Sequence, residues 1–229
     1  QLEELSSFLV EITEVCLRTR DPDDGSDLVE AIVDAAGQKG TGLWTVVSAL
    51  EMGVSVPTIY AALNARVLSS LRPERLAAEA ILPAVRPSQL PTRSFDLGDP
   101  ASGMGPLRDA TILACIASYA QGMALLQEAS SLHDYALNFP EIGRIWKGGC
   151  IIRARLLQRI QDAYNTNPAL PNLMVDPWFA EQINRRIGGL RQVVAGAAQA
   201  GIPVPCFSSS LDYISSYGTG RLPQNLVQA

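Results

Sequence analysis

Apolar residues recur at three- and four-residue intervals along most of the chain, which is the spacing of one face of an α-helix. In residues 2–19 the repeating positions are Leu2, Leu5, Leu9, Ile12, Val15 and Cys16. After a turn at 21–25, Ser26 or Asp27 is expected to cap a short helix that carries Leu28, Ile32 and Val33. The same spacing predicts further helices over 43–51, 58–70, a short segment from Pro73, 107–130, 139–164 with an interruption near Gly148-Gly149, 177–199 and 208–217.

Strand-like alternation never lasts more than a few residues, and no glycine-rich fingerprint follows a strand. The pattern therefore predicts an all-α fold: a large multi-helix domain with long antiparallel helices and no Rossmann domain. We expect this domain to span residues 1–217, with 83–106 as a surface excursion inside it and 218–229 as a loose tail. The long helices are apolar on several sides, which favours a homodimer in which a second subunit covers part of them.

Composition and charge exclude several classes of protein. The chain has 229 residues, of which 47% are apolar and 18% charged, and this balance excludes a disordered protein. No apolar run reaches the roughly 18 residues of a membrane span. The net charge of −5 argues against nucleic acid as the main partner. The four cysteines lie far apart, which predicts reduced, buried thiols in a cytoplasmic protein and no metal site.

The segment Gly37-Gln38-Lys39-Gly40-Thr41-Gly42 is the first candidate for chemistry. Three glycines, a lysine and a threonine precede a predicted helix, so exposed amides and two side-chain donors face any bound phosphate or carboxylate. Leu43 stands where a Walker loop requires lysine, which argues against nucleotide cleavage. An ordinary glycine-rich connection between helices is an equally good interpretation of the residues alone. Only two of the 18 basic residues are lysines, Lys39 and Lys147, and both precede glycine.

Three other positions are weaker candidates. Arg66 lies among small and apolar residues of a helix, where an arginine either extends to solvent or binds an anion. The pair Gly148-Gly149 marks a helix kink or a backbone that contacts a ligand, and the kink is the simpler interpretation. His133 is the only histidine, has no neighbour typical of a nucleophile, and is expected at the surface.

Five ordered blocks resemble the C-terminal domain of 6-phosphogluconate dehydrogenase. They are Gly37–Thr45 followed by Ala65–Leu71, Ser118–Gly122, Ile145–Arg153, Ala200–Pro205 and Arg221–Ala229. The resemblance runs from Ser7 to Ala229. Two positions depart from the family pattern: Leu43 replaces a lysine, and Lys147 replaces an arginine.

The resemblance implies an NADP-dependent enzyme of the pentose phosphate pathway. It converts 6-phosphogluconate to ribulose 5-phosphate and CO2 without a metal, by means of a lysine base and a glutamate acid. In the family both catalytic residues and the NADP-binding Rossmann domain precede the segment that this chain matches, so none is assigned here. The resemblance implies that Lys39, Thr41 and Arg66 hold the substrate's phosphate end and that the backbone of Ile151 contacts the substrate. It also implies a C-terminal tail, truncated here, that reaches the neighbouring subunit's site.

Two alternatives remain at this point. One is a helical dimerisation module without catalysis, and the other is a related β-hydroxyacid dehydrogenase for a non-phosphorylated acid. Neither needs the lysine–threonine loop together with Arg66. The chain begins with Gln1 rather than Met, so we expect a piece of a longer protein, inactive as a dehydrogenase by itself.

Overall fold

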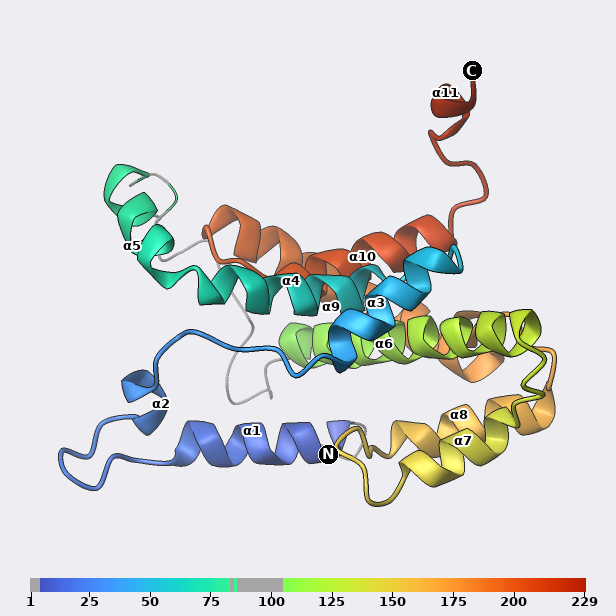
Figure 1. The fold of residues 1–229 in the computed structure, drawn as a ribbon, viewed down its shortest axis with the longest axis horizontal. Helices are drawn as coiled ribbons and strands as arrows, with labels where there is room; N and C mark the ends of the chain where they lie inside the picture. Colours follow the sequence, from blue (N-terminus) through green and yellow to red (C-terminus); the bar gives the residue numbers. More distant parts are fainter. Residues whose placement is uncertain (1–4, 83–84, 86–104) are drawn as a thin grey trace.

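The protein is a layered helical domain built around one long helix (Figure 1). The computed structural model describes residues 5–82, 85 and 105–229. Helix α6 (Gly105–Leu132) packs along α9 (Pro177–Gln199), and α10 (Pro205–Tyr217) contacts both of them. On the other side of α10 lies α4 (Pro57–Ser70), which also contacts α3 (Thr41–Glu51). The predicted all-α class is confirmed, since the described residues contain only two isolated β-bridges and no strand.

Helices α6 and α9 run antiparallel, as predicted. Arg186 of α9 lies 3.4 Å from Asp109 near the start of α6, while Gln127 near the end of α6 donates to the carbonyl of Leu170, just before α9. By length and hydropathy alone, α6 is long and apolar enough to cross a membrane. This was not expected from the sequence, because it shows no uninterrupted apolar run of that length. The position of α6 accounts for this hydropathy, because half of the apolar window is buried within the domain.

A lower layer contains α1 (Phe8–Arg18), α7 (Phe139–Trp146) and α8 (Leu156–Thr166) (Figure 1). The predicted start of the first helix was wrong, because Ser7 caps α1 and residues 5–7 are not α-helical. Instead, Ser6 and Ser7 pair with the segment before α8: the Phe8 amide donates to Arg153 at 3.1 Å, and the Arg155 amide donates to Ser6 at 3.0 Å.

Other predicted boundaries shift in ways that capping residues explain. The stretch 139–164 is two helices rather than one interrupted helix, since residues 147–155 form the connection. Helix α10 begins at Pro205 instead of Ser208, with proline in its first turn. The shorter elements are α2 (Leu28–Ala31), α5 (Arg72–Ile81), the 3₁₀ turn η6 (Leu173–Val175) and α11 (Asn225–Gln228). Most of the predicted excursion at 83–106 lies outside the described residues.

A buried amide fixes α4 on the core. The N-cap position of α4 is Val56, which has no polar side chain to bind the first amides of the helix. Gln121 of α6 replaces such a cap: its Oε1 accepts from the Thr58 amide at 3.0 Å and, more weakly, from the Ile59 amide at 3.4 Å. Its Nε2 donates to the Thr58 hydroxyl, which is 3.0 Å from the Ser210 hydroxyl of α10. One fully buried side chain therefore joins three helices.

The substitution Gln121→Met tests this role. It preserves length but leaves the Thr58 and Ile59 amides without their acceptor and the Thr58 hydroxyl with Ser210 alone, so we expect the free energy of unfolding to fall by about 2–4 kcal/mol. Gln127→Met on the same helix removes a single hydrogen bond to a carbonyl and is the matched control, with an expected loss of about 1 kcal/mol. Urea unfolding of both variants measures the difference. Equal losses would contradict the capping role.

Candidate functional site

The glycine-rich loop leads directly into α3 and adopts a conformation that requires glycine. Gly40 is the N-cap of α3 with φ of 97°, a value that L side chains rarely adopt. A Cβ at this position would also lie 3.3 Å from the Trp44 ring. Because Gly40 has no side chain, the amides of the first turn, at Thr41 to Leu43, receive no side-chain cap. Within the described residues these amides have no hydrogen-bond acceptor, so they are available as donors together with the Thr41 hydroxyl.

Helix α4 brings Arg66 to the same region. A Cβ on Gly42 would lie 3.5 Å from the Leu63 side chain, so the first turn of α3 packs closely on α4 at this point. Arg66 follows Leu63 by three residues and therefore lies on the same face of α4. This contact brings the start of α3 against the face of α4 on which Arg66 lies.

The side-chain donors of this region fall into two groups. Lys39, Thr41 and Arg66 make no side-chain hydrogen bond or ion pair with the described residues, and Lys39 and Arg66 are exposed. Arg72 and Arg75, which follow on α5, both form ion pairs with the Asp34 carboxylate, with nitrogen–oxygen distances of 2.9 and 3.0 Å. The hydrogen bond from Arg75, followed by that from Arg72, holds the pKa of the Asp34 carboxyl below its ordinary value. The three donors implied by the resemblance are thus the ones that remain available.

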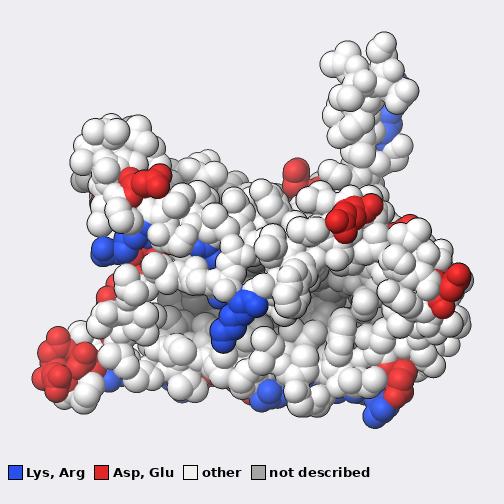
Figure 2. Space-filling model, in the orientation of Figure 1, with Lys and Arg blue, Asp and Glu red and all other residues white. Residues whose placement is uncertain are grey.

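A cleft of about 810 Å³ lies between α1 and the layer formed by α3, α4 and α6, and Lys39, Thr41 and Arg66 are not among its lining residues. Figure 2 shows this face hollowed between the two layers. Its lining includes Thr45 and Ala62, which lie one helical turn from Thr41 and Arg66 respectively. Thr41 and Arg66 are therefore each one helical turn from a residue that lines the cleft.

Ile151 lines the same cleft and is largely exposed. The Tyr119 hydroxyl donates to the carbonyl of the next residue, Ile152, at 2.5 Å and holds this segment against α6. Burial is the largest cause that raises the pKa of Tyr119 above its ordinary value, so the phenol remains a donor across the physiological range. Sequence reasoning did not identify Tyr119 as a support for Ile151.

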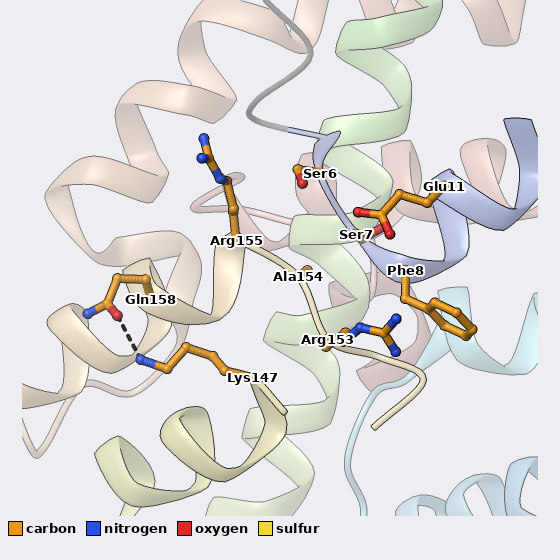
Figure 3. Close-up of a pocket in the computed structure, with 9 residues that line it drawn as sticks. All are labelled: Ser6, Ser7, Phe8, Glu11, Lys147, Arg153, Ala154, Arg155 and Gln158. Atoms are coloured by element: carbon orange, nitrogen blue, oxygen red, sulfur yellow. Dashed lines mark hydrogen bonds between the residues drawn. The ribbon is translucent and has the colours of Figure 1, made fainter. Parts of the chain in front are cut away.

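A second, shallower pocket of about 330 Å³ also contains basic residues, but Lys147 and Arg153 already contact other side chains of the protein there (Figure 3). Lys147 donates to the side-chain oxygens of Gln158 and Gln161, each at 2.7 Å, and so holds the connection between α7 and α8. The Arg153 guanidinium lies 3.9 Å from the centre of the Phe8 ring. The second lysine that precedes glycine therefore has a structural role, and only Lys39 remains a candidate for the anion.

The remaining sequence candidates have mixed outcomes. His133 is exposed, as predicted, and its ring lies 5.2 Å from that of Tyr135. The prediction of buried thiols was wrong for Cys16, which is exposed on α1, while the other three cysteines are half-buried. None of the four forms a disulfide, and the described residues contain no cluster of metal-ligating side chains.

Comparison with known proteins gives one consistent family. The model of the 6-phosphogluconate dehydrogenase C-terminal domain matches residues 1–229. A decarboxylating 6-phosphogluconate dehydrogenase from Synechocystis is 52% identical over 229 residues, which are all of this chain and 46% of the relative. The Bacillus subtilis protein, described as NADP(+)-dependent and decarboxylating, is 42% identical over 226 residues, which are 99% of this chain and 47% of that protein.

A solved structure of Plasmodium falciparum 6-phosphogluconate dehydrogenase superposes with a TM-score of 0.87 at 39% identity. It covers 97% of this chain, which in turn covers 46% of it, and it is described in apo form, with NADP+ and with 6-phosphogluconate. This chain therefore spans about half the length of the relatives it matches.

The conformation of the loop can be tested at its glycines. Gly40→Ala introduces a side chain at a positive φ and against Trp44, so we expect the free energy of unfolding to fall by about 1–3 kcal/mol. Gly37→Ala is the matched control, because no atom lies within 4 Å of its added Cβ and its φ is not positive, and it should change stability by less than about 0.5 kcal/mol. Thermal unfolding compares the two. A Gly40→Ala variant as stable as Gly37→Ala would disprove the assigned conformation.

Proposed function

Because the chain belongs to the 6-phosphogluconate dehydrogenase family, as its C-terminal domain, we propose that it is the substrate-binding and dimerisation domain of an NADP-dependent decarboxylating enzyme. The proposed reaction oxidises 6-phospho-D-gluconate to D-ribulose 5-phosphate and CO2. The identity of 52% to a relative with that name, over the whole of this chain, supports this proposal.

The proposal rests on Lys39, Thr41 and Arg66, three donors near the cleft that make no side-chain hydrogen bond or ion pair within the described residues. Lys39 supplies a compact charge, Thr41 a hydroxyl, and Arg66 a planar guanidinium that binds phosphate oxygens in pairs. The uncapped amides at the start of α3 add favourable dipoles. Several donors acting together suit a doubly charged phosphate. We propose that Lys39, Thr41 and Arg66 bind the substrate's phosphate end and that the Ile151 backbone contacts the rest of the molecule.

In this proposal the chain orients the substrate and leaves the redox step to another domain. With its phosphate fixed near the cleft, the sugar acid extends toward residues that this chain does not supply. The described residues include no strand, glycine loop and helix in succession, so they do not fit NADP. The cofactor is assigned to a Rossmann domain of the longer protein. We also propose a cytoplasmic location, although one relative, from rice, is named chloroplastic.

Both alternatives conflict with the arrangement of the donors. A non-catalytic dimerisation module has no use for three donors without internal partners beside a glycine-rich loop. A related β-hydroxyacid dehydrogenase that acts on a non-phosphorylated acid has no need for Lys39 and Arg66 on adjacent elements.

The phosphate role is tested by Arg66→Ala in the full-length protein. Loss of a charge-assisted, bidentate contact should raise KM for 6-phosphogluconate about 30- to 1000-fold. Arg144→Ala is the control, because among the described residues this exposed arginine pairs only with Glu141 on α7. Initial rates of NADPH formation measure both. An unchanged KM in Arg66→Ala would remove the assignment.

We further propose that the chain forms a homodimer. Helix α11 projects from the body of the molecule, and Leu226 and Val227 on it are more than 80% exposed (Figure 1). Trp44 and Leu50 on α3 are also exposed, so apolar surface is available on separate elements.

Sedimentation of the purified chain should give the mass of a dimer. Replacing Leu226 and Val227 with serine should raise the dimer dissociation constant about tenfold or more, because two apolar side chains lose a buried environment. A chain that sediments only as a 24.6 kDa monomer would count against the homodimer.

A further inference from the structure

The segment that precedes the glycine loop is tied to the α4–α5 junction by one set of hydrogen bonds. The Asp34 carboxylate accepts from Arg72 Nε at 2.9 Å and from Arg75 Nη1 at 3.0 Å. Arg75 Nη2 also donates to the carbonyls of Asp34 and Ser69, at 3.1 and 3.0 Å. A single guanidinium thus contacts the backbone of both segments.

A second connection passes through the Ser69 hydroxyl. This hydroxyl accepts from the Ala36 amide at 2.9 Å and donates to the carbonyl of Arg66 at 2.8 Å. Ala36 immediately precedes Gly37, the start of the loop. One hydroxyl therefore links the backbone of the loop segment to the backbone of the residue assigned to the phosphate.

These contacts are the main restraint on the loop. Residues 33–39 have no regular secondary structure and are exposed. Within the described residues, they form no hydrogen bonds other than those of Asp34 and Ala36. At its other end the loop is fixed by Gly40, whose carbonyl accepts from the Trp44 amide at 3.0 Å. Lys39 lies between the two attachment points, so the position of its backbone depends on both.

We propose that Asp34 and Ser69 are positioning residues for the phosphate site. They attach the segment that leads into the loop, with Lys39 and Thr41, to the end of α4 that carries Arg66. This inference rests on the proposed function. Neither residue contacts the substrate; each acts through the backbone of the loop. An isolated surface ion pair contributes little, but here one carboxylate is shared by two arginines, one of which also binds two carbonyls.

The chain provides a matched control for Ser69. The Ser70 hydroxyl donates to the carbonyl of Val67 at 2.7 Å, which is the same bond within the helix, but it does not contact the loop. Ser69→Ala should therefore raise KM for 6-phosphogluconate about five- to tenfold with kcat little changed, whereas Ser70→Ala should leave KM unchanged. Ser69→Thr retains the hydroxyl and should restore KM.

Asp34 has a corresponding control in Asp27, a half-buried aspartate whose carboxylate lies 2.7 Å from Arg20. Asp34→Asn should raise both KM and the inhibition constant of inorganic phosphate about tenfold, with KM for NADP unchanged, and Asp27→Asn should change neither. Inhibition by phosphate isolates the effect at the phosphate site from effects on the rest of the substrate.

These measurements are made in the full-length protein and include Arg66→Ala. If Arg66→Ala raises KM while Ser69→Ala and Asp34→Asn behave like their controls, the positioning role is disproved and the phosphate site stands. If Arg66→Ala has no effect, the proposed function fails first. A fall in kcat with unchanged KM in Ser69→Ala would also overturn the positioning role. Should Ser69→Ala not fold, Asp34→Asn and Ser69→Thr still decide the question.

Discussion

The Gln121 amide is the constraint on which the placement of α4 depends. Helix α4 begins with a valine and a proline, neither of which can cap its exposed amides, and a buried glutamine from α6 supplies the missing acceptor. The same amide orients the Thr58 hydroxyl toward α10. Because the start of α4 is fixed on the core, its opposite end, which carries Arg66 and Ser69, extends from a rigid base. The glycine loop is then attached to that end through Ser69 and Arg75. The placement of the candidate site therefore depends on a buried polar contact at the other end of α4.

The hydrogen bonds and ion pairs of the basic residues identify the candidate site better than their positions in the sequence do. Arg72, Arg75 and Lys147 lie close to motifs of interest, yet each is held by an internal partner. Lys39 and Arg66 have no such partner among the described residues, although Arg66 lies just before Arg72 in the chain. The Asp34 carboxylate offsets the charge of the two arginines, and two glutamine oxygens occupy the donors of Lys147 without changing its charge. The uncommitted pair retains its full attraction for an anion, which is the property that a phosphate site requires.

Sequence periodicity predicted the long helices well, because the buried positions of α6 and α9 recur at three- and four-residue intervals over many turns. The glycine loop was also predictable, since its glycines reflect a local backbone requirement at Gly40. The start of α1 was missed because Ser7 pairs with Ala154, which is far away in the sequence. The contact of Asp34 with Arg72 and Arg75 was missed for the same reason: it spans about 40 residues and has no periodic signature. Local patterns specify helices and turns, whereas the attachment of one element to another depends on the assembled fold.

The central claim is that Lys39, Thr41 and Arg66 form a single phosphate site near the cleft. A crystal structure of the full-length protein with 6-phosphogluconate bound tests it most directly. We predict that the substrate's phosphate oxygens lie about 2.7–3.2 Å from Lys39 Nζ, Thr41 Oγ1 and the Arg66 guanidinium. A phosphate bound elsewhere, with Arg66 directed into solvent, would contradict the account.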